Sequence, residues 1–403
     1  MFVLRTDGSF KFLNYWGNPT IMVQGEKNVN IKTVLKTSVA AAALMAVAAP
    51  AVVSPAQAEL SNGNKNKLVM SGQIARSLVY QDNGQDASLF NVDGIDTATR
   101  LRWIASGQMT ESVTVGGIIE MNMPRSNSTY SLGQRGTADT STDAATWGMR
   151  KTEVTFAHKA AGKFYIGQGS AAGDGASTNS LGSWGPSMSA QGAGGAGSSA
   201  FVNSATNALT GITVGSATGQ YDPGRIDRIR YDTPSFGGLK LSASLGANSQ
   251  SGVGASYGGK FGGIQVSAGA FYQKSDGAAG NVDGTMGGSV AIKHDSGLSA
   301  HLGYTREDSR TGIIEGKEWH GGIGYAASLT NLGTTGFAVN YTRADDSTSI
   351  GDQGEILGLA VNQSISSVGT DVFLSYSRVS YDDTTATNYD DFSAIMAGTR
   401  LKF

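Results

Sequence analysis

The stretch VTVGGIIEMN, residues 113–122, contains the pattern that decides how most of this chain folds. Its odd-numbered residues, from Val113 to Met121, are apolar or Gly, and most of its even-numbered residues, such as Thr114 and Glu120, are polar or Gly. Side chains alternate between the two faces of an extended chain, so a period of two places the apolar residues on one face. The stretch therefore predicts a β-strand with one apolar and one polar face.

The same period of two recurs on both sides of this stretch, from Leu68 to the C-terminal Phe403. No part of that region has the period of a long amphipathic helix. The pattern predicts about sixteen strands, at residues 67–80, 97–110, 111–123, 146–159, 162–169, 225–235, 238–248, 251–261, 263–274, 283–294, 297–308, 316–328, 334–345, 353–365, 369–381 and 391–403. Single-chain bacterial barrels have an even number of strands, so this number fits a closed barrel.

The predicted connections alternate in length along the chain. Those near residues 110, 160, 234, 262, 296, 330 and 367 are short, and those near residues 85, 138, 277, 310, 346 and 384 are longer and more polar. The connection at 248–251 is short where a long one is expected. Short turns on one side and long loops on the other are typical of a barrel that spans a membrane. The predicted fold class is therefore all-β, a transmembrane antiparallel β-barrel.

Residues 170–224 interrupt this series between the fifth and sixth predicted strands. They are mostly Gly, Ala, Ser, Thr and Asn, and their only charged residues are Asp174 and Asp222. A loop of this length inside a compact domain is normally either functional or disordered. Because small side chains allow close packing against a wall, we expect this segment to fold into the barrel and to line its lumen.

The composition agrees with a membrane barrel. Charged residues make up 15% of the chain and hydrophobic residues 39%, and the mean hydropathy is −0.16. A barrel around a polar lumen needs only about one apolar residue in two, so its sequence is hydrophilic on average. The chain has no Cys, which excludes disulfides and Cys-based metal or redox sites.

A targeting signal precedes the first strand. Lys32 and Lys36 are followed by an apolar run from Val39 to Val53 and then by the sequence Ser-Pro-Ala-Gln-Ala at 54–58. This order predicts a signal peptide at 31–58 with cleavage after Ala58, and the alternative is a transmembrane helix. Residues 1–30 are interpreted as an N-terminal extension from a mis-assigned start codon. The mature domain would then be 59–403.

Removal of residues 1–58 takes away five basic and two acidic residues, so the net charge changes from −2 to −5. An acidic chain of this kind has no basic footprint for nucleic acid. We therefore expect no nucleic-acid partner.

Three stretches and one residue carry a resemblance to a known family: KLVMSGQIARSLVYQDNG at 67–84, GKFYIGQGS at 162–170, GRIDRIRYDTPSFGGLKLSASL at 224–245 and the terminal Phe403. With them the mature chain resembles a Gram-negative general porin of the α-proteobacterial type. The resemblance implies an outer-membrane homotrimer, in contact with lipid and lipopolysaccharide, that passes ions and small hydrophilic solutes by diffusion without a cofactor. It also implies that 170–224 is the constriction loop.

One departure from the family concerns this loop. The acidic Pro-Glu-Phe-Gly-Gly motif of enterobacterial porins is absent, and GAGGAGSS occupies residues 192–199. The acidic side of the constriction is therefore expected to carry less negative charge here.

The chemistry of such a channel is electrostatic, because charges in a narrow water-filled lumen act strongly on passing solutes. If Leu101 and Trp103 face outward, strand alternation places Arg100 and Arg102 inside. The same parity gives the other pore-lining candidates on the strands, Glu120, Glu153, Arg228, Arg230 and Lys240. The resemblance places loop carboxylates opposite such a basic wall, here Asp174 and Asp222. The alternative for each charge is a solvated position at one of the two mouths.

Catalysis finds little support in the sequence. Four His residues fall on four separate predicted strands, and the metalloprotease motif H-E-x-x-H does not occur. An outer-membrane β-barrel enzyme of the phospholipase or protease type stays an alternative, because distant strands can assemble a catalytic site. A Gly/Ala-rich secreted adhesin is a third reading, but it requires a repeat of fixed period, which we do not find.

Overall fold

The computed structural model describes residues 3–4, 10–11, 66–94, 97–122, 147–183, 185–188, 197–219, 221–247, 249–275, 282–309 and 314–403. The chain divides into two units, Met1–Ser38 and Val39–Phe403. In the first unit the described residues form a two-stranded antiparallel sheet of β1 (Val3–Leu4) and β2 (Phe10–Lys11). The predicted signal peptide at 31–58 and most of the predicted extension at 1–30 lie outside the described residues.

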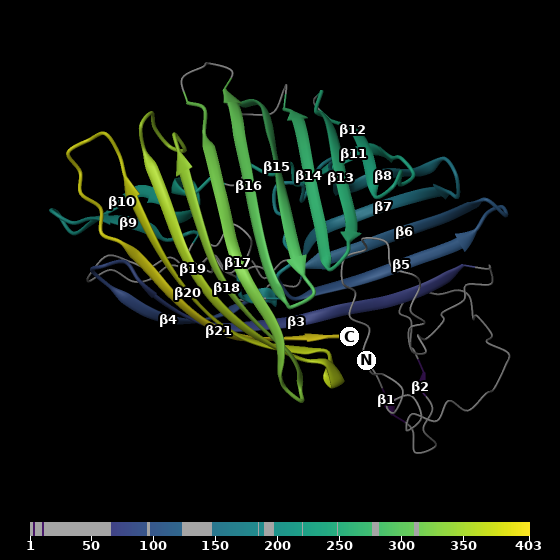
Figure 1. Cartoon of the computed structure of the whole chain (residues 1–403), viewed down its shortest axis with the longest axis horizontal. Helices are drawn as coiled ribbons and strands as arrows, with labels where there is room; N and C mark the ends of the chain where they lie inside the picture. Colours follow the sequence, from purple (N-terminus) through teal and green to yellow (C-terminus); the bar gives the residue numbers. More distant parts are fainter. Residues whose placement is uncertain are drawn as a thin grey trace. The chain divides into compact units, whose positions relative to one another are not determined.

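The second unit contains a closed antiparallel barrel (Figure 1). Before the long loop its strands are β3 (Lys67–Asp82), β4 (Ala87–Asp93), β5 (Arg100–Gln108), β6 (Val113–Asn122), β7 (Gly148–His158) and β8 (Gly162–Ser170). After the loop they are β11 (Arg225–Asp232), β12 (Leu239–Gly246), β13 (Ser251–Phe261), β14 (Ile264–Lys274), β15 (Val282–His294), β16 (Leu298–Ser309), β17 (Lys317–Thr330), β18 (Gly333–Asp345), β19 (Gln353–Ile365), β20 (Thr370–Asp382) and β21 (Phe392–Lys402). The last strand, β21, lies beside the first, β3, and closes the ring.

The predicted number of strands is confirmed, with one correction. The C-terminal half of β3, residues 76–82, pairs with β4, and its N-terminal half, residues 67–73, pairs with β5. The strands β4 and β5 therefore form one interrupted strand. With that pair counted once, the described part of the chain forms a ring of sixteen strands, five before the long loop and eleven after it. The region near Gln85, predicted to be only a polar connection, contains β4.

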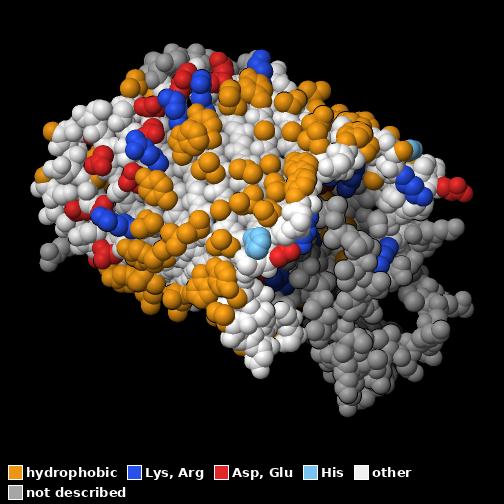
Figure 2. Space-filling view, viewed as in Figure 1, with side chains coloured by type: hydrophobic (Ala, Val, Ile, Leu, Met, Phe, Trp, Pro, Cys, Tyr) orange, Lys and Arg blue, Asp and Glu red, His pale blue; other side chains and the backbone are white. Residues whose placement is uncertain are grey.

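The two faces of the wall differ as the alternation predicts. Large apolar side chains cover the outer face and form a broad band in Figure 2, with charged side chains beside it at the upper left and at the right. Exposed members of this band include Leu241, Val253, Tyr272, Ile292, Leu302, Ile323, Val339, Leu359, Leu374 and Ile395. The inner face carries polar, charged and small residues, so the barrel has an apolar exterior around a polar lumen.

The long loop folds against the inner face, as predicted. It contains the 3-10 helix η1 (Gly185–Ser187), a hairpin of β9 (Ala200–Asn203) and β10 (Ala208–Thr213), and the one-turn helix α2 (Val214–Ala217). Thr213 caps α2 with its side chain. A second 3-10 helix, η2 (Ser366–Val368), joins β19 to β20. No helix among the described residues is long and apolar enough to span a membrane.

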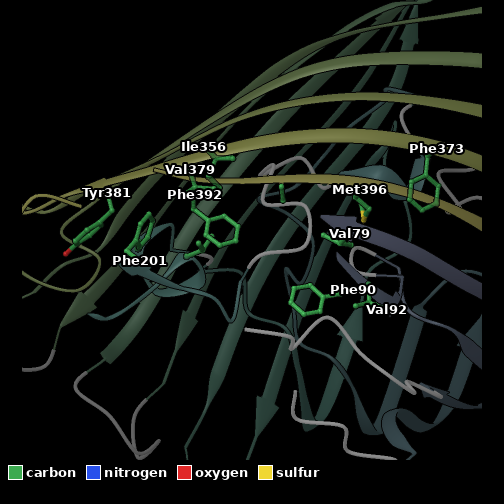
Figure 3. Close-up of a cluster of buried hydrophobic side chains, with 13 residues drawn as sticks. Val79, Phe90, Val92, Phe201, Ile356, Phe373, Val379, Tyr381, Phe392 and Met396 are labelled. Carbon is green, nitrogen blue, oxygen red and sulfur yellow. The ribbon is translucent and has the colours of Figure 1, made fainter. Parts of the chain in front are cut away.

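An apolar cluster fixes the hairpin and α2 to the wall (Figure 3). Phe201 is fully buried, and its ring centroid lies 5.5 Å from that of Tyr381 on β20. The wall members of the cluster come from five elements of the barrel: Val79, Phe90, Val92, Ile356, Phe373, Val379, Tyr381, Phe392, Ala394 and Met396. The loop is therefore an integral layer of the fold on this side of the lumen.

Candidate functional site

Three arginines surround one buried carboxylate on the inner wall. Arg100 and Arg102 lie on β5, directly opposite the end of β6 that carries Glu120. Their distances to the Glu120 carboxylate are 3.8 Å from Arg100 Nη1 and 3.3 Å from Arg102 Nε, and Arg150 Nε on β7 lies at 2.7 Å. One negative charge faces three positive charges, so this cluster keeps a surplus of positive charge.

The Glu120 side chain is 5% exposed, whereas the three guanidinium side chains are 17%, 26% and 19% exposed. The carboxylate is thus enclosed by the arginines, and their outer surfaces remain open. The structure brings Arg100, Arg102 and Glu120 together, three of the residues singled out in the sequence.

Strand alternation did not identify Arg150. Glu120 pairs with Lys151 and the next residue, Met121, pairs with Met149, so Arg150 is the extra residue of a bulge. Strict alternation turns Arg150 outward, but the bulge re-aims it toward Glu120. No feature of the sequence locates a bulge of this kind.

A second group of charges holds the root of the long loop. Arg228 Nη2 lies 2.5 Å from Glu153 Oε2, and the same guanidinium donates to the carbonyl oxygens of Ser170 and Gly167. Its side chain is 1% exposed. Because its donors are occupied by the chain itself, Arg228 ties the loop root to the wall.

Arg230 forms a similar anchor two residues further along β11, on the same face of the strand. It donates to the carbonyl oxygen of Ala171 and pairs with Asp232 at 2.7 Å. Asp232 also accepts from the hydroxyl of Tyr165, whose ring lies near Lys163, Arg228 and Arg230. Lys240 shares the inner face of β12 with Ser244, which accepts a hydrogen bond from the loop.

The two loop carboxylates lie together rather than apart. Asp222 accepts hydrogen bonds from Gly175 N at 2.6 Å and from Ser177 Oγ at 2.5 Å, and the carboxyl of Asp174 lies beside it. These contacts join the beginning of the loop to its end. We call Asp174 and Asp222 the carboxyl pair.

Burial raises the pKa of Asp222, the neighbouring Asp174 carboxyl adds to this rise, and hydrogen bonds from Ser177 and Gly175 partly offset it; the resulting pKa is about 6. The ordinary value for Asp is about 4. The charge of the loop therefore changes close to neutral pH.

The inner face of β5, β6, β7, β8, β11 and β12 is predominantly basic. Its basic side chains include Arg100, Arg102, Arg150, Lys151, Lys163, Arg228, Arg230 and Lys240, and its acidic side chains include Glu120, Glu153 and Asp232. In the ring of sixteen strands β15 lies halfway around from β5. The loop segment beside the carboxyl pair lies against β15, since Asn179 N donates to Ser289 Oγ at 2.9 Å.

A closed ring of this size, with a loop folded onto its polar inner face, is the architecture of a channel. A family model described as Gram-negative porin matches residues 40–384. The chain belongs to the Gram-negative porin family. This porin is thus a channel of the outer membrane that conducts by passive diffusion.

Solved structures show the same fold at low sequence identity. The chain is similar to a loop-deletion mutant of OmpT from Vibrio cholerae, with a TM-score of 0.56 and 14% identity over 84% of this chain and 100% of that one. It is similar to the anion-selective porin from Comamonas acidovorans, with a TM-score of 0.55 and 15% identity over 84% and 100%. OmpF from Salmonella typhi gives a TM-score of 0.51 and 15% identity over 85% and 100%. No curated protein sequence matches the chain.

The raised pKa of Asp222 predicts a pH-dependent ion preference. As the pH rises from 5 to 7 the carboxyl pair gains negative charge, so the zero-current potential in a salt gradient should move toward cation preference. Because the pKa in the folded protein lies above the ordinary value, the contribution of Asp222 to stability is present below about pH 4 and is lost as the pH rises through about 6. In the Asp222→Asn variant the potential should stay nearly constant over this range, and an unchanged pH dependence would contradict the assignment.

Proposed function

We propose that this porin is a homotrimer that passes ions and small hydrophilic solutes through a constriction with a weak preference for anions. The observation that carries the proposal is the set of three arginines around Glu120, which leaves surplus positive charge on the wall. Charges at this separation interact by about 1 kcal/mol even in bulk water and more strongly beside low-dielectric walls. A passing anion is therefore stabilised more than a cation.

The predicted site residues divide into two roles under this proposal. Arg100 and Arg102 act on solutes, together with Arg150, because their guanidinium groups are partly exposed. Arg228, Arg230 and Glu153 act on the loop, because their hydrogen bonds hold its root. We place Lys240 on the lumen wall, and we place the carboxyl pair on the opposite side of the constriction.

Planar bilayers separate the porin from an enzyme of the same architecture. The purified protein should give stepwise conductance that is linear in voltage, in salt alone and without any substrate. An outer-membrane hydrolase would instead show turnover with little or no conductance. Absence of conductance steps from correctly folded protein would contradict the proposed function.

The trimer is supported by one of the similar structures, OmpT of Vibrio cholerae, which is described in a trimer form. If this chain also forms a homotrimer, the detergent-purified protein should migrate as a heat-labile oligomer and give a monomer band only after boiling. The outer apolar band would then contact lipid and lipopolysaccharide where the trimer leaves it uncovered.

Protein from the outer membrane should begin at Glu59, which tests signal cleavage after Ala58.

A further inference from the structure

Five glycines on the inner wall occur where the backbone of the long loop touches it. They are Gly254 on β13, Gly269 on β14, Gly303 on β16, Gly336 on β18 and Gly354 on β19. A Cβ atom on Gly269 would lie 2.9 Å from both Cα and the carbonyl oxygen of Ala176. On Gly336 it would lie 2.1 Å from the carbonyl oxygen of Ser183, and on Gly354 it would lie 2.1 Å from that of Ala217. We call these five residues the glycine seat.

The remaining two members follow the same pattern. A Cβ atom on Gly254 would lie 2.6 Å from Gly173 N, and on Gly303 it would lie 2.7 Å from the Ser177 carbonyl oxygen. The Gly303 position also borders the ring of His320. For Gly269, Gly336 and Gly354, the nearest atoms are all loop atoms. A substitution at any of these three positions would therefore contact the loop alone.

The backbone of the wall does not itself require glycine at these positions. None of the five has a φ between +20° and +160°, and all lie within strands. Glycine inside a strand weakens it, because it costs chain entropy and offers no side chain for packing. The remaining reason for glycine is the close approach of another backbone, and here that backbone is the loop.

Hydrogen bonds fix the loop at the same level of the wall. Ser289 on β15 lies between Gly269 and Gly303 as their direct cross-strand neighbour. Its hydroxyl accepts from Asn179 N at 2.9 Å and donates to the Ala176 carbonyl oxygen at 2.7 Å. The loop is thus bonded to a position flanked by two glycines, which allow its backbone to lie flat on the wall.

We propose that the glycine seat positions the constriction loop and sets the cross-section of the open pore. The proposal rests on the proposed function, because it concerns the width of the same channel. A side chain at the seat would occupy the space of the loop backbone, and a close-packed contact cannot absorb that volume without movement. The wall is held by strand pairing on both sides, so the loop would be displaced toward the lumen.

The experiment compares single-channel conductance of Gly269→Ala, Gly336→Ala and the double variant with the unmodified porin. We expect a fall in conductance that is roughly twofold in the double variant, since displaced volume adds at two separate contacts. Conductance is measured one channel at a time, so a smaller folded fraction does not imitate this result. The matched control is Gly117→Ala on the outer face of β6, where the nearest atom to a Cβ lies at an ordinary 3.5 Å.

Two further measurements distinguish a specific effect of the glycine seat on the loop from a general disturbance of the barrel. At residue 336 the series Ala, Ser, Val should reduce conductance progressively, whereas the same series at residue 117 should not. In a porin that lacks residues 177–213, which include Ser183, Gly336→Ala should have no effect. Unchanged or increased conductance in the Gly269 and Gly336 variants would overturn the proposed role of the glycine seat, although the porin still conducts. Failure of the proposed function would instead appear as no conductance in the unmodified protein.

Discussion

Replacing Arg100 and Arg102 together by Ala should shift the zero-current potential of this porin toward cation preference in dilute salt. Both guanidinium groups are partly exposed beside Glu120, and both contribute to the surplus of positive charge on this wall. In the double variant Arg150 alone would balance Glu120. The expected change is about fivefold in the anion-to-cation permeability ratio, the equivalent of about 1 kcal/mol.

The measurement is the reversal potential across a planar bilayer in a tenfold salt gradient, repeated at high salt. Screening acts over about 10 Å at 0.1 M and about 3 Å at 1 M, so the shift should shrink as salt increases. Arg343 and Arg378 provide the control, because both lie on the outer face and pair with Asp345 and Asp391. Their double substitution by Ala should leave the potential unchanged.

Asp174→Asn should move the potential the opposite way, toward anions, because it removes charge from the other side of the constriction. If neither substitution affects the potential in dilute salt, the arginines around Glu120 and the carboxyl pair do not line the narrow part of the channel.

Deletion of residues 177–213 should increase single-channel conductance several-fold and at the same time destabilise the barrel. The larger conductance follows from removal of most of the layer that lies inside the lumen. The loss of stability follows from the apolar cluster, which loses the fully buried Phe201 and the partly buried Ile212. Truncation of a buried Phe alone typically costs about 3–5 kcal/mol, because the cavity adds to the lost transfer free energy.

Conductance and the temperature at which the folded band is lost on gels would test both effects. Phe201→Ala separates them, since it disrupts the cluster and keeps the loop. We expect this variant to melt earlier, with irregular conductance from a loop that is no longer held on that side. A deletion variant of unchanged conductance would mean that the loop does not restrict the channel.

The sequence alone determined the barrel, the number of its strands and the position of the loop. Strand alternation is a local property, and a wall between an apolar exterior and a polar lumen imposes it on every strand. The same parity placed Arg100, Arg102 and Glu120 on one face, because residues of adjacent strands that share a face and a level become neighbours. These predictions need no knowledge of distant contacts.

Only the tertiary structure decided how the loop is held and which charges remain exposed. The bulge that turns Arg150 to Glu120 breaks the parity rule, and β4 forms because β3 extends far enough to pair with it. The seat glycines look like ordinary weak points of strands until Ser183 and Ala217 lie against them. Each of these features depends on contacts between residues far apart in the chain, and a pattern of period two carries no information about such contacts.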